Sequence, residues 1–290
     1  MYEQFYGLQT RPFELSPDPR FLLLTRGHRE ALSTLQYAVS GRKGVALLIG
    51  EAGTGKTTLI HAALATQQPD RMTVFLSNPA LTRDEFFEFL ADGFQMPPDA
   101  GMSKTRLLLS LTRRLRERQE MGGVTALIID EAQCLSDGLL EEVRLLANIE
   151  TATEKLLSII LVGQPELAER LNQPSLRQIK QRVGLRCALA PLDRAEAAAY
   201  IATRIQVAGG ECAGLFERSA IDMIYERSGG IPRTMSVICD NALVAGFALD
   251  RRPVDHEIVL EVCRDLDLTV REEAVPVTPQ SMPLLGGSAG

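Results

Sequence analysis

The sequence contains no tryptophan, few aromatic residues and no long apolar run. Phe, Tyr and Trp together make up 5% of the 290 residues, whereas hydrophobic residues make up 45% and charged residues 23%. No stretch of 18 apolar residues is present, so no segment is predicted to span a membrane. The mixed, aromatic opening Met1–Thr10 lacks the basic and apolar pattern of a signal peptide. We therefore expect a cytoplasmic globular protein that does not insert into a membrane directly and is long enough for two domains.

Two further deficits exclude classes of site. The five cysteines, at positions 134, 187, 212, 239 and 263, are scattered and form no CxxC pair, so neither a disulfide framework nor a zinc site is expected. The formal net charge of −6, from 31 basic and 37 acidic residues, excludes a basic footprint of the whole chain for nucleic acid. The net charge does not exclude a basic patch on one part of the surface. Arg113, Arg114, Arg116 and Arg118 would lie on one helix, but Glu117 and Glu120 interleave with them and favour a solvated face.

Short apolar runs alternate with helical periodicity over the first two thirds of the chain. The apolar runs predict buried strands at residues 45–49, 73–76, 124–129, 157–162 and 183–189. The segments between them predict helices at residues 28–40, 56–65, 82–95, 103–120, 137–149 and 165–180. Strands alternating with helices predict an α/β fold whose parallel sheet is covered by helices on both faces.

From Pro191 onward the strand pattern stops and helices are predicted at residues 193–208, 217–228, 232–249 and 254–265. Asp193 and Glu196 have the spacing of a capping box at the start of the first of these. We expect an α/β domain at residues 1–190, a small all-helical domain at 191–268 and a disordered tail at 269–290. The proline-containing opening, Tyr2–Thr25, is predicted to be an extended segment that lies on a core.

Residues 50–57 match the pattern GxxxxGK[ST] at every position, with a predicted strand before them and a helix after them. Glycines let backbone N–H groups wrap around phosphate oxygens, and the following helix N-terminus adds positive potential. Lys56 would place a charge near the β- and γ-phosphates, and the Thr57 hydroxyl would bind Mg²⁺. The sequence thus predicts an ATP phosphate loop formed by Gly50, Glu51, Ala52, Gly53, Thr54, Gly55, Lys56, Thr57 and Thr58.

An acidic pair follows the apolar strand predicted at residues 124–129. Ligand sites of open α/β sheets lie at the carboxyl ends of the strands, which is where Asp130 is expected. Asp130 would support Mg²⁺, and Glu131 would orient and deprotonate the attacking water. The two motifs together predict a nucleotide-hydrolysing site.

These motifs, followed by a helical domain, resemble the AAA+ ATPases, and further runs resemble the ExeA class of secretion-associated ATPases. Those runs are Tyr6-Gly7-Leu8, Pro12-Phe13, Ser16 to Phe21, His28 to Leu32, Gly163-Gln164-Pro165-Glu166-Leu167 and Gly230-Ile231-Pro232-Arg233. The resemblance covers residues 1–268 and implies an AAA+ sheet followed by a helical lid. Fuller members of the class continue into a membrane span and a peptidoglycan-binding domain. Because neither follows before Gly290, the chain looks closer to shorter members beside pilus and exopolysaccharide systems.

The resemblance also implies roles for individual residues. Gln164, at the end of the fourth strand, would help position the attacking water. Arg182, or as a second choice Arg186, would reach the nucleotide of a neighbouring subunit. Arg233 would sense the γ-phosphate from the lid, and His28 would lie near the adenine.

The function implied by the resemblance is that of an assembly or regulatory ATPase in a bacterial envelope system, such as secretion, pilus formation or exopolysaccharide export. It would work as a homo-oligomer with ATP and Mg²⁺, with a protein partner that brings it to the inner membrane. Two alternatives stay open. One is a transposition-type regulator that associates with DNA, and the other is a nucleotide-gated interaction module with negligible turnover.

Overall fold

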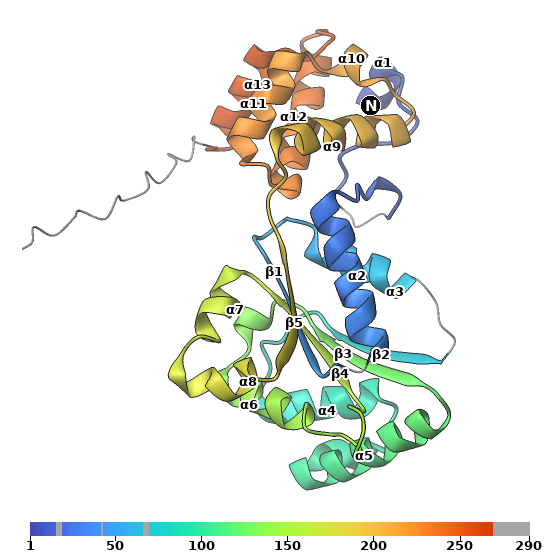
Figure 1. Cartoon of the computed structure of the whole chain (residues 1–290). Helices are drawn as coiled ribbons and strands as arrows, with labels where there is room; N and C mark the ends of the chain where they lie inside the picture. The colour runs from blue at the N-terminus through green and yellow to red at the C-terminus, as the bar shows by residue number, and fades with distance from the viewer. Residues whose placement is uncertain (16–18, 42, 66–69, 269–290) are drawn as a thin grey trace, which may run out of the picture.

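The computed structural model describes residues 1–15, 19–41, 43–65 and 70–268. The predicted disordered tail at residues 269–290 and the first half of the run 16–21 lie outside the described residues. In Figure 1 the chain forms a sheet with flanking helices below and a group of helices above.

Five parallel strands form one sheet in the order β2-β3-β4-β1-β5. The strands are β1 Val45–Gly50, β2 Arg71–Leu76, β3 Val124–Ile129, β4 Ser158–Gly163 and β5 Val183–Leu189. All residues of β1 and β4 are buried, because these strands are covered by neighbouring strands and by helices on both faces. The predicted α/β fold with a parallel sheet is confirmed.

Alternate side chains of the strands enter two different cores. On one face, Ala46 and Leu48 pack with apolar side chains of α2 Arg26–Ser40 and α3 Lys56–Ala65. On the other, Leu47 and Ile49 pack in a core with α4 Arg83–Gly93, α5 Lys104–Glu120 and α6 Asp137–Leu146. This alternation follows from the period of two residues along a strand. Short 3₁₀ turns occupy Pro98–Met102 (η2) and Ala132–Cys134 (η3).

Beyond β5 the chain is helical. The helices are α9 Arg194–Val207, α10 Cys212–Leu215, α11 Arg218–Ser228, α12 Pro232–Ala248 and α13 His256–Asp265. We call this group the lid. Asp193 and Glu196 form the predicted capping box of α9. The lid has an apolar core of its own, with Ile201, Ile224 and Ile238 among its members.

Two predictions of local structure were wrong. The segment predicted as one helix over residues 165–180 is broken into α7 Pro165–Arg170, η4 Pro174–Leu176 and α8 Arg177–Lys180. Pro174 explains the break, because proline lacks the N–H that a continuing helix needs. The opening segment is not extended throughout, since Tyr2–Tyr6 forms the helix α1, which ends at Gly7 with φ 70°. The first proline comes only at position 12, so nothing prevents a helical turn before it.

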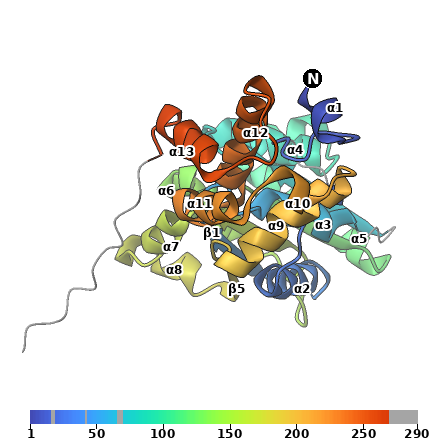
Figure 2. The ribbon, with the colours of Figure 1, turned by 90° about the horizontal axis from the view of Figure 1, so that it is seen from above.

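The opening segment, by which we mean the described residues before Thr25, packs on the lid. Tyr2, Tyr6, Phe13 and Phe21 belong to the same apolar core as the lid helices, and α1 lies beside α12 (Figure 2). The prediction that this segment lies on a core is therefore right, and that core is the one of the lid. The division into domains at residue 190 stays a prediction.

Candidate active site

The phosphate loop joins β1 to α3 at the edge of the sheet that faces the lid (Figure 1). Gly53 and Gly55 have φ values of +82° and +94°, which side chains disfavour. A Cβ added to Gly50 would come within 2.8 Å of Thr54 Oγ1 and 2.9 Å of the Leu189 carbonyl oxygen. The glycines of the motif are therefore needed both for backbone conformation and for close packing against β5.

Lys56 is buried at the first position of α3. Its Nζ donates hydrogen bonds to the carbonyl oxygens of Gly50, at 2.8 Å, and of Glu51, at 2.9 Å. Burial lowers the pKa of the ammonium group, and the nearby carboxylates of Glu131 and Asp130 oppose that shift. The ammonium group thus lies inside the loop, which is where a bound phosphate would need a cation.

Thr57 and Asp130 lie side by side at the carboxyl ends of the strands. Thr57 Oγ1 donates a 2.7 Å hydrogen bond to Asp130 Oδ2, and the second carboxylate oxygen accepts from the Glu131 N–H at 2.9 Å. Asp130 directly follows β3 and is buried. A hydroxyl and a carboxylate are the hard oxygen donors that Mg²⁺ prefers, usually completed by water and phosphate oxygens. These two residues fit a magnesium ion shared with a nucleotide.

Glu131 begins the turn after β3 with a left-handed backbone, φ 49°. Its Oε2 accepts hydrogen bonds from the side-chain amides of Gln133 and Gln164, the latter at 3.3 Å. The Gln133 Oε1 in turn accepts from the Gln164 backbone N–H at 3.1 Å. The predicted catalytic residues Glu131 and Gln164 are therefore brought together, and Gln133 links them.

Gln133 and Arg170 were missed as site residues from the sequence. Arg170, on α7, donates to the carbonyl oxygens of Gln133 at 2.6 Å and Leu135 at 2.9 Å, and forms an ion pair with Asp137. Gln133 follows Glu131 by two positions in the sequence, and this proximity could have indicated it as a site residue. No local signal points to Arg170, because it is distant in sequence and acts on backbone atoms.

His28 contacts the phosphate loop from the first turn of α2. Its Nε2 lies 3.4 Å from the Thr54 carbonyl oxygen, and its Nδ1 lies 2.8 Å from Thr25 Oγ1. The carbonyl can only accept, so Nε2 carries the proton and Nδ1 accepts from the Thr25 hydroxyl. Burial lowers the pKa of the imidazole, which favours this neutral form.

The lid reaches the loop at the start of α12. The Arg233 N–H donates to the Gly53 carbonyl oxygen at 3.2 Å, and a Cβ on Gly53 would lie 2.7 Å from Arg233 Cβ. The predicted lid residue is thus in direct backbone contact with the phosphate loop.

A cavity of about 370 Å³ lies between these elements, a size that small-ligand sites often have. Its walls come from the loop, the acidic turn, the lid and the opening segment: Glu14, Leu15, Phe21, Leu22, Leu23, His28, Gly53, Thr54, Gly55, Lys56, Thr57, Thr58, Glu131, Leu192, Tyr200, Arg204, Pro232, Arg233 and Ser236. Apolar residues of the opening segment and residues of the phosphate loop both line it. Five predicted residues at or beside the loop are not among the cavity-lining residues, namely Gly50, Glu51, Ala52, Asp130 and Gln164.

Arg182 and Arg186 lie outside this cavity. Both are exposed, Arg182 just before β5 and Arg186 within it, opposite Leu47. In the parallel sheet the other end of β5, Leu189, pairs with Gly50 of the phosphate loop. Both arginines therefore lie away from the phosphate loop of their own chain.

Comparison with known proteins indicates what this chain is similar to. A family model described as "AAA domain" matches residues 39–171. General secretion pathway protein A of Aeromonas hydrophila is 41% identical over 260 residues, which cover 88% of this chain and 47% of the relative. The chain contains an AAA domain and is similar to the ExeA-type AAA+ ATPases over most of its length. It spans about half the length of that relative.

Solved structures of other proteins share the fold of this chain. The Cdc6 protein of Pyrobaculum aerophilum has a TM-score of 0.67 at 18% identity, with 88% of this chain and 70% of that chain covered. The RuvB branch migration motor of Thermotoga maritima has a TM-score of 0.55 at 19% identity, with 83% and 69% covered. Within the described part of the AAA+ chain, no helix is both long and apolar enough to cross a bilayer.

Proposed function

We propose that this chain binds ATP with Mg²⁺, hydrolyses it, and serves as an assembly or regulatory ATPase of a bacterial envelope system. The observation that carries the proposal is the meeting of Lys56, Thr57, Asp130 and Glu131 at one edge of the sheet, with Thr57 and Asp130 2.7 Å apart. These are the cation, the two oxygen donors and the carboxylate that phosphoryl transfer to water requires.

Each residue has a defined task in this proposal. Lys56 and the loop N–H groups bind the phosphates, and Thr57 with Asp130 would hold Mg²⁺, which when bound neutralises charge on the phosphate oxygens. Glu131 accepts the proton of the attacking water, and Gln164 helps to orient that water. Arg233 contacts the γ-phosphate from the lid, and His28 lies near the adenine. The cavity supports this, because it extends from the loop to the lid and the opening segment.

The envelope role rests on the relative at 41% identity, whose printed name is a secretion-pathway protein. By analogy we propose that the chain acts on the cytoplasmic side, at the inner membrane, through a protein partner. The exposed positions of Arg182 and Arg186, away from their own phosphate loop, support a homo-oligomer in which Arg182, or else Arg186, completes a neighbour's site.

The DNA-associated alternative is not favoured. Proteins of DNA metabolism resemble this chain in fold at only 16–20% identity, which says nothing about DNA binding here. Of the arginines on α5, Arg118 donates to the Asp70 carbonyl and Arg114 to Gln95. Of the four arginines at positions 113, 114, 116 and 118, only Arg113 and Arg116 are exposed, so the basic face is smaller than the sequence implied.

The test is ATP turnover as a function of protein concentration, for the wild type and Glu131→Gln, with and without duplex DNA. A specific rate that rises with concentration and disappears in Glu131→Gln supports an oligomeric ATPase. If DNA raises the rate of ATP turnover and salt reduces this effect, the DNA-associated function would be favoured over the envelope function. A negligible rate in every condition, with ATP still bound, would contradict autonomous hydrolysis and favour a nucleotide-gated interaction module.

A further inference from the structure

Arg204 is a buried arginine on the first lid helix, α9, whose side chain is directed at the opening segment. Its Nε donates to the Pro12 carbonyl oxygen at 2.5 Å, and its Nη2 donates to the Glu14 carbonyl oxygen at 2.9 Å. Burying a charged group is costly unless its donors are satisfied. These two carbonyls therefore offset the cost of burying the guanidinium group, and the guanidinium group in turn satisfies the two carbonyls.

The same guanidinium group packs against two aromatic rings. Its Cζ lies 4.8 Å from the ring centroid of Phe21 and 5.4 Å from that of Tyr200, within the range of cation–π contact. Glu14, Phe21, Tyr200 and Arg204 all line the cavity. Opening segment and lid thus form one continuous wall, with Arg204 at their junction.

A chain of hydrogen bonds leads from this junction to the phosphate loop. Arg204 Nη1 donates to the Tyr200 hydroxyl at 2.9 Å, and that hydroxyl lies 2.8 Å from Ser236 Oγ and 3.3 Å from the Pro232 carbonyl oxygen. The next residue, Arg233, donates its N–H to the Gly53 carbonyl oxygen. The part of the cavity wall around Arg204 is therefore connected to the phosphate loop.

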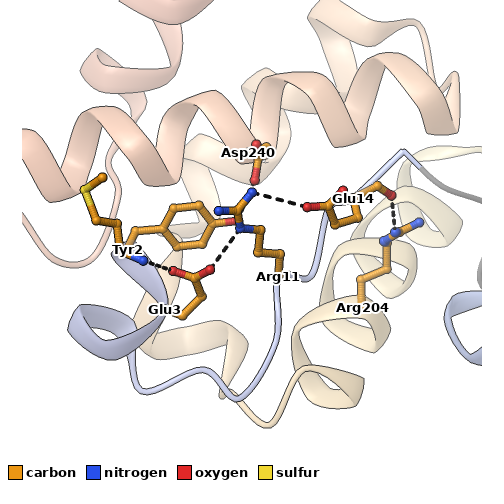
Figure 3. A network of polar contacts seen from close by, with 7 residues as sticks. Tyr2, Glu3, Arg11, Glu14, Arg204 and Asp240 are labelled. Atoms are coloured by element: carbon orange, nitrogen blue, oxygen red, sulfur yellow. Dashed lines mark hydrogen bonds and ion pairs between the residues drawn. The ribbon is translucent and has the colours of Figure 1, made fainter.

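Other hydrogen bonds also join the opening segment to the lid: the buried Tyr6 hydroxyl donates to the Leu243 carbonyl oxygen at 3.1 Å, and the Gln9 N–H donates to the Ala208 carbonyl oxygen at 2.8 Å. Figure 3 shows the ion pairs that join Glu3, Arg11 and Glu14, and the contact of Tyr2 with Asp240 of α12. The Arg11 side chain is 53% exposed, and exposed ion pairs contribute little. Arg204 differs from these links because it is a buried charged group whose Nε and Nη2 both donate to backbone carbonyls of the opening segment.

We propose that Arg204 is a positioning residue for the nucleotide: it fixes the opening segment to the lid and so preserves the wall against which the base and ribose of ATP lie. This inference rests on the proposed function. In it, the phosphates are bound by the loop and need no help from Arg204, whereas the nucleoside part depends on the wall.

The test compares Arg204→Lys with Arg194→Lys in the full chain. Arg194 lies on the same helix but forms exposed ion pairs with Asp222 and Glu226, so it controls for loss of a guanidinium group on α9. The affinity for ATP and for inorganic triphosphate, each with Mg²⁺, is measured by displacement of a fluorescent ADP. We expect Arg204→Lys to weaken ATP binding about tenfold, as for the loss of one charged hydrogen bond, with triphosphate binding unchanged. Arg194→Lys should change neither.

A second readout is hydrogen exchange of peptides from residues 5–15. Arg204→Lys should speed their exchange, including that of the Gln9 amide, which donates to the Ala208 carbonyl, and Arg194→Lys should not. If Arg204→Lys does not fold, Tyr200→Phe takes its place, since it removes the hydroxyl that accepts from Arg204. An affinity loss of about threefold is expected for ATP alone, smaller than for Arg204→Lys because the two bonds of Arg204 to the opening segment remain.

The outcomes separate this inference from the proposed function. A wild-type chain that binds neither ligand would contradict the proposed function itself. If the wild type binds ATP but the variant keeps full ATP affinity, the inference is wrong while the function stands. Equal losses for ATP and triphosphate would also overturn it, because they would indicate a general structural role.

Discussion

Thr57 Oγ1 donates a 2.7 Å hydrogen bond to Asp130 Oδ2, although 73 positions separate the two residues. Thr57 is in the first turn of α3 and Asp130 directly follows β3. The strand that precedes Thr57, β1, does not pair with β3, since β4 lies between them. The two oxygen donors of the candidate magnesium site thus come from strands that are not neighbours, and only the assembled sheet brings them together.

Asp130→Asn should remove most of the effect of Mg²⁺ on ATP binding. The amide keeps the shape of the side chain but loses the charge that would hold the cation. We expect the ratio of ATP affinities with and without Mg²⁺ to fall at least about tenfold, which corresponds to about 1.4 kcal/mol. Calorimetric titration with and without EDTA measures this ratio. Asp84→Asn, at an exposed aspartate on α4, is the control, and an unchanged ratio in Asp130→Asn would exclude Asp130 as a metal ligand.

Gln133→Ala should slow hydrolysis more than it weakens binding. Without the Gln133 amide, Glu131 loses one of two donors to its Oε2, and a misplaced general base is less effective. We expect kcat to fall roughly 10- to 100-fold, less than for loss of the general base itself because Glu131 is still present, with Kd for ATP nearly constant. Gln181→Ala changes an exposed glutamine and should leave both constant. A rise in the Kd for ATP as large as the fall in kcat would argue against a positioning role.

Arg182→Ala should abolish turnover in a homo-oligomer and be rescued by mixing. The Arg182→Ala chain keeps an intact nucleotide site, whereas Lys56→Ala loses its site but keeps Arg182. If Arg182 acts in trans, a mixture of the two inactive proteins should recover part of the wild-type rate. The same mixture made with Arg186→Ala decides between the two arginines. Absence of rescue with either arginine would contradict action in trans.

His28 should make the stability of the protein depend on pH below about 6.5. Burial lowers the pKa of His28 in the folded chain from its ordinary value of 6.5, so between the two pKa values the unfolded chain binds more protons. The stabilisation by neutral His28 is therefore complete above pH 6.5 and is lost as the pH falls towards the folded pKa. His28→Gln keeps a donor for Thr54 but does not titrate.

Thermal melting at pH 7.5 and 5.5 tests this expectation for wild type and His28→Gln. The decrease in Tm between the two pH values should be larger for the wild type, and the difference between the two decreases is the contribution of His28. Equal decreases would mean that the imidazole has the same pKa in the folded and unfolded chain.

Much of the sheet was predictable because its strands are short apolar runs with polar or glycine-rich borders. β3 and β5 begin and end at the predicted residues. The phosphate loop was equally predictable, since its function requires fixed residue types at fixed spacing. By contrast, the break at Pro174 was missed because apolar periodicity takes no account of the N–H that proline lacks, and the helix Tyr2–Tyr6 was missed because five residues are too few to show helical periodicity.

The sequence by itself determined the parallel α/β fold, the helical lid and the candidate residues of the phosphate loop and acidic pair. Only the tertiary structure decided that Gln133 and Gln164 share Glu131, and that Arg204 holds the opening segment. The reason is physical. Motifs and periodicity report interactions between residues near one another in the chain, whereas the partners of Arg204 lie 192 and 190 positions away and are backbone carbonyls, which every residue possesses.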